Sequence, residues 1–496
     1  MKALTGLQHT SPLTRAILLG SMLELLFILI SMLLPFSSTH PVYSASDPIW
    51  FWIFVPAQSL VLKTSVLSLR FTDPATNFLL LSLVIISLSS IYLYIVGNTF
   101  HTTHNMPLTS RWLLVPIIGA TIFGITLLFV PALFNNDANN YLYKGLALFF
   151  HLANCLLIWA ILANLAPARR LGGTLLYAWN PLALVELAGY GYNDGLLIFF
   201  LLLTTLFIIQ LKGHLYDFWG MVFLGCAMSM NGIALLFAPI IIYFSMLHAT
   251  KHTASETPIL VGEQGTPISL PSRSLRGKYL QVVWECFWRT LVVVVTATVL
   301  YFLFWQRRST FTSIFSAFDM QYLLHSPLSI LVIPVQLLNS FLFRILYPPA
   351  AFPANYLQAI PTANMAVQAS ALFIFVLTYL YLFRRVRSAD SFLTSLCLAM
   401  LGFFILLAGQ FWPWFILWVL WIIALRRFDT LTISVLLLSC TALLTYPLLY
   451  VDNIPNAIYQ PLLIFGIPLI YLITRLIRSN ERMNLFYDRR SETAKN

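Results

Sequence analysis

Two acidic residues lie in a short polar segment between two strongly apolar stretches of the chain. Glu186 and Asp194 both fall in the run from Trp179 to Leu196, in a protein of which only 9% of the residues are charged. Carboxylates near a membrane are costly and usually mark a functional site. The structural alternative is that Asn193 and Asp194 only cap a helix, because a carboxylate stabilises a helix N-terminus. Both interpretations remain open from this pattern alone.

The composition predicts an integral membrane protein. Hydrophobic residues make up 59% of the 496 residues and the mean hydropathy is +0.83. Apolar runs of roughly 18 residues or more recur along the chain. They lack an alternation of period two, so they predict helices rather than barrel strands. We therefore expect an all-α, polytopic transmembrane helical bundle with about 11–13 crossings.

The net charge of +11 is explained by the excess of Lys and Arg in cytoplasmic loops, so we expect no nucleic-acid partner. With both termini in the cytoplasm, alternating loops leave 6 of the 28 Lys and Arg outside. These are Lys63, Arg70, Lys144, Arg307, Arg308 and Arg344. We expect a multi-pass protein of the plasma membrane in contact with its lipids. The five cysteines are scattered singly and predict neither a disulfide nor a metal site.

The pattern divides the chain into five parts. They are N-terminal helices over 1–111, a core over 112–248, a cytoplasmic linker over 249–281, C-terminal transmembrane helices over 282–478 and a basic cytoplasmic tail over 479–496.

Four of the apolar segments carry specific expectations. Residues 171–187 and 194–211 predict one helix on each side of the acidic segment. The stretch 218–246 is interrupted by Ser229 to Gly232, so it predicts two half-helices that meet at the outer face and place Asn231 beside Asp194. The proline-rich surroundings of 327–346 predict a juxtamembrane or re-entrant element.

This topology gathers a set of polar and aromatic side chains on the outer face. A carboxylate there can act as a general base, cations can hold a phosphate leaving group, and aromatic rings can stack on sugars. The set favours chemistry on a lipid-linked phosphate over transport of a soluble substrate. The alternatives are that the arginines anchor lipid headgroups and that the tryptophans belong to the aromatic belt. The set comprises Asp137, Lys144, Glu186, Tyr192, Asn193, Asp194, Asn231, Arg307, Arg308, Trp412 and Trp414.

Three segments of this face, in chain order, resemble motifs of one enzyme group. They are the acidic loop 130–141, the segment from Trp179 to Asp194, and the aromatic run from Phe411 to Trp418. The motifs resemble those of GT-C-type glycosyltransferases that use polyprenyl-phosphate sugars, in particular the bacterial polyprenol-phosphomannose-dependent α-mannosyltransferases. The resemblance covers roughly residues 112–450.

The resemblance implies an inverting transfer of a hexose such as mannose on the extracytoplasmic face. The donor would be a polyprenyl-phosphate sugar, and the acceptor a cell-envelope glycan or glycolipid. Asp137 matches the catalytic base and Asp194 the second acid, and the other residues of the set would bind substrate. The resemblance implies no organic cofactor, assigns no metal ligands and leaves open whether a divalent cation takes part.

The chain departs from the family pattern at two points. Its first outer loop has only about ten residues, and Asn231 stands where the family often has a lysine. Two other functions therefore stay open: a transporter or flippase of lipid-linked intermediates, in which Glu24, Glu186 and Asp194 relay protons or ions, and a catalytically inert relative.

Overall fold

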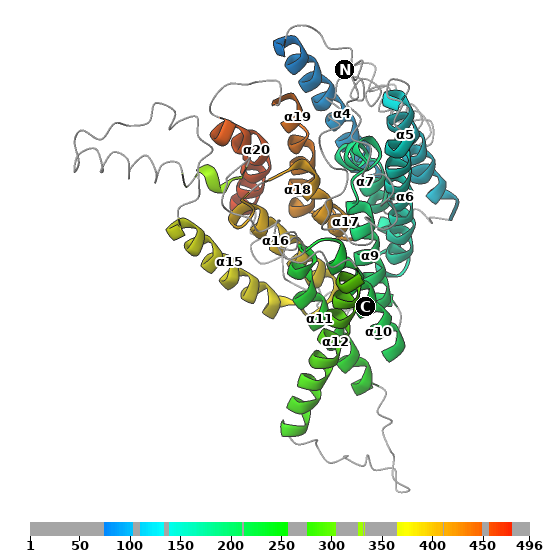
Figure 1. Cartoon of the computed structure of the whole chain (residues 1–496), viewed down its shortest axis with the longest axis vertical. Coiled ribbons are helices and arrows are strands. Elements are labelled where there is room, and N and C mark those ends of the chain that lie inside the picture. The colour runs from blue at the N-terminus through cyan, green and yellow to red at the C-terminus, as the bar shows by residue number, and fades with distance from the viewer. Residues whose placement is uncertain are drawn as a thin grey trace, which may run out of the picture.

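The computed structural model of this protein is all-helical wherever it describes the chain (Figure 1). The described residues are 74–102, 110–132, 138–210, 213–255, 275–303, 326–330, 332, 365–409, 411–448 and 456–478. Within them, 6 helices are long and apolar enough to cross a membrane, and shorter apolar helices accompany them. The chain is a helical membrane protein, as its composition predicts.

The first part of the bundle surrounds the acidic segment. It contains α4 (Pro74–Thr102), η2 (Ser110–Leu113), α5 (Leu114–Ala132), α6 (Ala138–Leu165), η3 (Pro167–Arg169), α7 (Arg170–Ala178), α8 (Pro181–Ala183), η4 (Leu184–Tyr190), α9 (Asp194–Gln210), α10 (His214–Met230) and α11 (Ala234–Ser255). Helices α5, α6 and α9 lie side by side, with α10 packed on α9 (Figure 1).

The second part follows the linker. It contains α12 (Leu275–Leu303), α15 (Met365–Arg385), α16 (Ala389–Leu406), η6 (Pro413–Ile416), α17 (Leu417–Leu425), α18 (Thr430–Ala442), α19 (Thr445–Leu448) and α20 (Asn456–Arg478).

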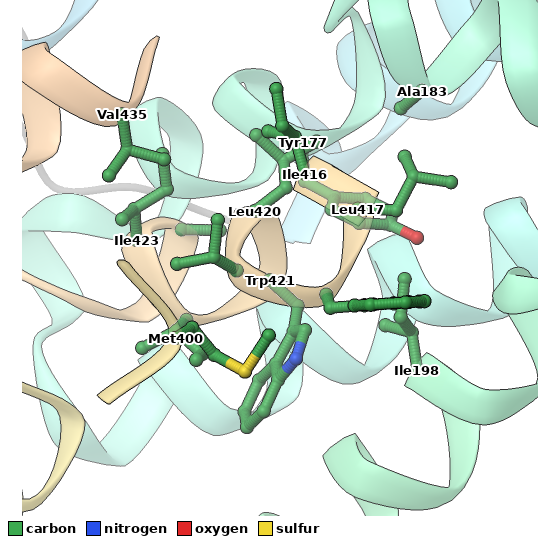
Figure 2. Close-up of a cluster of buried hydrophobic side chains, with 14 of the residues drawn as sticks. Tyr177, Ala183, Ile198, Met400, Ile416, Leu417, Leu420, Trp421, Ile423 and Val435 are labelled. Atoms are coloured by element: carbon green, nitrogen blue, oxygen red, sulfur yellow. The ribbon is translucent and has the colours of Figure 1, made fainter. Parts of the chain in front are cut away.

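Helix α17 lies at the centre of the molecule. Every one of its residues is buried, as expected of a helix that is apolar on all sides. Figure 2 shows it among Tyr177 of α7, Ile198 of α9, Met400 of α16 and Val435 of α18. The central helix thus joins elements from both parts of the chain into one hydrophobic core.

The prediction of a single helix over 171–187 is wrong. Helix α7 ends at Ala178, and the Asn180 side chain accepts hydrogen bonds from the backbone N–H groups of Leu182 and Ala183, at 3.0 and 3.2 Å. Pro181 follows at the first helical position, where its missing N–H costs nothing. Asn-Pro therefore stops one helix and starts another. The continuation, η4, is a π-helix.

The predicted break in 218–246 is confirmed, because α10 ends at Met230 and α11 begins at Ala234. The two pieces are longer than the half-helices expected, since α10 begins at His214 and α11 reaches Ser255. At 1.5 Å per residue they measure about 25 and 33 Å, so each is longer than half of a hydrocarbon core of about 30 Å. The apolar run alone underestimates them because their polar ends are helical too. Helix α11 ends at Ser255 and α12 begins at Leu275, so both helices extend into the range 249–281.

A buried arginine holds three helices together. Arg289 of α12 is fully buried, and its guanidinium donates to Asp217 of α10 at 2.8 Å and to the Ser245 hydroxyl of α11 at 3.0 Å. It also forms an ion pair with Glu285 on its own helix. Of the element predicted over 327–346, the structure describes only a few residues, so that prediction lies largely outside the described part of the chain.

Candidate functional site

The acids that the structure describes fall into two groups. Asp217 and Glu285 pair with Arg289, while Asp390 and Asp429 pair with arginines at the end of α17. In the described ranges Glu186 and Asp194 have no basic partner within ion-pair distance. Each of the four paired acids neutralises a neighbouring cation. Glu186 and Asp194 have no such structural task, which makes them the candidate functional pair.

Glu186 lies on the π-helix η4 and is fully buried. Its Oε1 accepts a hydrogen bond from the hydroxyl of Tyr446 on α19, and its Oε2 has no partner among the described residues. Single π-helical turns occur frequently at functional sites. Burying a carboxylate oxygen without a hydrogen-bond donor lowers the stability of the fold. Packing alone therefore does not explain why Glu186 is present at this position.

Asp194 is the first residue of α9 and is 4% exposed. Its Oδ1 accepts a hydrogen bond from the indole N–H of Trp418, on the central helix α17, at 2.8 Å. The predicted N-cap role is therefore wrong for Asp194, because the residue lies inside the first turn and its carboxylate contacts another helix. The helix dipole still favours a negative charge at this end.

Five aromatic rings form a continuous row beside the two acids. Trp412 stacks on Trp414 with centroids 5.0 Å apart, and Trp414 stacks on Tyr192 at 4.7 Å. Tyr190 continues the row, 6.2 Å from Tyr192 and stacked at 5.6 Å on Tyr446. The row thus ends at the tyrosine that hydrogen-bonds Glu186.

The electrostatics tie Tyr192 to both acids. Burial, and after it the negative charges of Glu186 and Asp194, raise the pKa of the Tyr192 hydroxyl well above its usual value. The phenol therefore stays protonated and can donate a hydrogen bond. Of the predicted set, stacking brings Tyr192, Trp412 and Trp414 together.

Lys144 of α6 lies against the bend that precedes Asp194. It is 5% exposed, and a Cβ placed on Gly191 would lie 3.1 Å from its Cγ and 3.2 Å from its backbone nitrogen. Gly191 has a φ of 77°, which favours glycine. The bend therefore needs glycine for both conformation and space, and α6 lies directly on it.

Asn231 lies at the same end of the bundle as Asp194 but does not hydrogen-bond it. Helices α9 and α10 are antiparallel, with Gly220 of α10 facing Thr204 and Ile208 of α9, so the last residue before the break reaches the level where α9 begins. The Asn231 Oδ1 instead accepts from the backbone N–H of Ile233 at 3.1 Å.

Three of the predicted site residues, Asp137, Arg307 and Arg308, lie outside the described residues. Within the described ranges, no three His, Cys, Asp or Glu side chains gather as a metal site would require. The two residues that donate to the acids, Trp418 and Tyr446, could not be selected from the sequence. Each lies in an apolar run, and only the packing of distant helices shows that its polar atom meets an acid.

No family model, curated protein or solved structure matches this chain. Its function therefore has to be inferred from the residues of the site.

Proposed function

We propose that this protein is an integral membrane glycosyltransferase with a GT-C-like architecture and about 11–13 crossings. It transfers a hexose, mannose-like, from a polyprenyl-phosphate donor to a cell-envelope glycan or glycolipid, on the extracytoplasmic face. The observation that carries the proposal is the pair Glu186 and Asp194, which lack a basic partner in the described part of the chain and adjoin the row of aromatic rings.

The reaction needs a base and a leaving group. One carboxylate takes the proton of the acceptor hydroxyl, whose oxygen attacks the anomeric carbon of the donor. The bond from that carbon to the phosphate oxygen breaks, and the polyprenyl phosphate leaves with the electron pair. A phosphate requires no proton on leaving at neutral pH. Inversion follows from the single displacement.

Asp137 and Asp194 are the carboxylates proposed for this chemistry. Asp137 directly precedes α6 in the sequence, and α6 contacts the bend at Gly191 through Lys144. In this proposal Asp137 is the base, and Asp194 orients the acceptor or donor. Glu186, further inside the protein, and Asn193 and Asn231 complete the polar side of the site.

The aromatic row supplies a surface for the sugar and lipid. Tryptophan rings sit well at headgroup level and can pack against a sugar. Trp412 and Trp414 are only partly buried, and because Trp414 is stacked between Trp412 and Tyr192, a sugar would meet Trp414 at its edge. Arg307 and Arg308 are proposed to hold the donor phosphate, since Arg binds phosphate in bidentate fashion.

The test is transfer by membranes that contain the full chain, offered a panel of radiolabelled polyprenyl-phosphate hexoses. We expect label to enter a glycan or glycolipid from at least one donor, with inverted anomeric configuration. Membranes that hold abundant folded protein but transfer no label from any donor would contradict the proposal and favour the inert relative.

A transporter or flippase of lipid-linked intermediates is the second candidate. The complete burial of Glu186 and its unpaired Oε2 favour it, because intramembrane acids commonly relay protons in transporters. Reconstituted protein separates the two functions. A flippase moves a fluorescent lipid-linked sugar across proteoliposomes and leaves its glycosidic bond intact, whereas the enzyme breaks that bond and moves no intact donor.

A further inference from the structure

A second cluster of charged residues lies where α7 begins and α17 ends. Arg169 and Arg170 stand at the start of α7, while Arg426 and Arg427 directly follow α17. The two helices approach very closely there: a Cβ on Gly173 would lie 2.3 Å from the carbonyl oxygen of Ala424. The four arginines are thereby held at one end of the bundle.

Two aspartates partly neutralise this cluster. Asp429 pairs with Arg426 at 2.9 Å and with Arg427 at 3.1 Å, and Asp390 lies 3.8 Å from Arg427. The four arginines and the two aspartates together carry a formal charge of +2.

Arg169 and Arg170 have no ion pair with any described residue. The Nη1 of Arg169 and the Nε of Arg170 are buried without a hydrogen-bond partner. The Arg170 guanidinium lies 4.4 Å above the Trp159 ring, which fixes its position. Both guanidinium groups therefore have an N–H donor that no described residue accepts.

The uncompensated charge is costly to the protein. Burial, chiefly, and the neighbouring Arg426 and Arg427 lower the pKa of Arg169, while Asp390 and Asp429 partly offset them. Arg426 is itself fully buried. Arg426 already has Asp429 as its counter-charge. Arg169 and Arg170 are partly buried and form no ion pair with a described residue, and an anion that accepts hydrogen bonds from them would supply the missing charge.

We propose that Arg169, Arg170, Arg426 and Arg427 form a binding site for a phosphate group. Phosphate monoesters carry a charge of about −1.5 to −2 near neutral pH, which matches the excess of this cluster. Guanidinium groups are the preferred bidentate partners of phosphate. The site is separate from the acidic pair, because Trp418, which donates to Asp194, precedes Arg426 by eight residues, or about 12 Å of helix.

The phosphate has two possible sources with the same chemistry. One is the headgroup of an anionic phospholipid at the membrane surface, and the other is a soluble phosphate compound. The location favours the lipid. The distribution of Lys and Arg predicts that this end of the bundle is cytoplasmic. Arg426 and Arg427 directly follow the end of α17, so a lipid headgroup at that surface can reach them.

The experiment uses the full-length protein in a maltoside detergent, which contains no phosphate. Thermal unfolding is followed during titration with short-chain phosphatidic acid, inorganic phosphate or the uncharged diacylglycerol of the same chain length. We expect saturable stabilisation by phosphatidic acid, weaker or no stabilisation by inorganic phosphate, and none by diacylglycerol. If inorganic phosphate stabilises the protein as strongly as phosphatidic acid does, a soluble phosphate compound is the ligand. If neither phosphate compound stabilises the protein, the site is excluded.

Arg169→Gln and Arg384→Gln are the matched variants. Arg384 is exposed and lies at the same end of the bundle, at the end of α15. Arg169→Gln removes an unpaired charge, so the free protein should unfold no earlier than wild type, and the affinity for phosphatidic acid should fall about tenfold or more. If Arg384→Gln lowers the affinity equally, the effect is general surface charge and the proposal is wrong.

Discussion

Asp194 and Glu186 each accept a hydrogen bond from one aromatic side chain. The other acids that the structure describes form ion pairs with arginines. Trp418 donates to Asp194, and Tyr446 donates to Glu186. A neutral donor orients a carboxylate without neutralising its charge. The pair is therefore not locked in an ion pair and can exchange a proton, which is the property that the proposed chemistry requires.

Replacing Trp418 by Phe tests the hydrogen bond to Asp194. The change leaves the buried Asp194 Oδ1 without its donor, and we expect the free energy of unfolding to fall by about 1–3 kcal/mol. Thermal unfolding of the purified protein measures this. Trp414→Phe is the control, since it keeps a ring in the stack with Tyr192. Equal losses in both variants would show that ring volume, not the hydrogen bond, matters at Trp418.

The limits of sequence-based prediction are also clear at this scale. The scarcity of charges indicates the acidic segment, and the predicted topology selects Trp412 and Trp414 because it places them on the outer face. The partners of the acids could not be found: the contacts Asp194–Trp418 and Glu186–Tyr446 join residues 224 and 260 positions apart. Sequence periodicity predicts helices, but it carries no information about which distant helices become neighbours.

At the scale of elements, breaks were predicted where polar residues interrupt an apolar run and missed elsewhere. Ser229 to Gly232 indicated the break between α10 and α11. Asn180-Pro181 carries an equally physical signal, because Asn caps a helix and Pro favours its first turn. The apolar residues on both sides concealed it. The π-helix that presents Glu186 has no sequence signature of this kind.

Because α7 and α17 are in close contact, adding one methyl group at Gly173 should strongly lower the stability of the protein. Gly173→Ala would place its Cβ 2.3 Å from the backbone carbonyl of Ala424, so the central helix must shift. We expect the variant to lose several kcal/mol of stability, as overpacking commonly costs about 1–3 kcal/mol or more. Gly97→Ala is the control, because nothing lies within 4 Å of its Cβ. Thermal unfolding in detergent should leave that variant unchanged or slightly stabilised.

Arg289 predicts how α10, α11 and α12 depend on each other. Arg289→Met leaves Asp217 and Glu285 without their cation, and breaking a buried ion pair in this way costs about 3–5 kcal/mol. Limited proteolysis should then cut near the ends of α10 and α12 faster than in wild type. Adding Asp217→Asn to this variant should restore part of the loss. If the double variant is no better than the single one, the ion pair is not the cause.

At the scale of the whole molecule, we predict that the arginine cluster lies at the cytoplasmic end of the bundle and that the acidic pair lies closer to the extracytoplasmic end. The distribution of Lys and Arg predicts that the linker lies in the cytoplasm. A cysteine introduced as Gly265→Cys should therefore react with a membrane-impermeant maleimide only in permeabilised cells. Labelling of intact cells at this position would reverse the orientation and move the acidic pair to the cytoplasmic face.

The fold class was predictable from the sequence because membrane insertion depends on composition and length, which are local properties. The site was predictable only in part, because it arises where α9, α17, η4 and α19 meet. The core of the molecule, α17 buried among helices from both parts of the chain, is a consequence of packing rather than of any segment by itself.

The most direct test of the proposed function is the rate of hexose transfer by Asp194→Asn relative to wild type. The amide oxygen still accepts from Trp418, so the variant should fold to normal abundance, yet transfer should fall by about 10²-fold, because the amide no longer orients the substrate as the carboxylate does. Asp137→Asn, measured in parallel, should lose at least as much if it is the base. Wild-type transfer by a normally abundant Asp194→Asn protein would contradict the account.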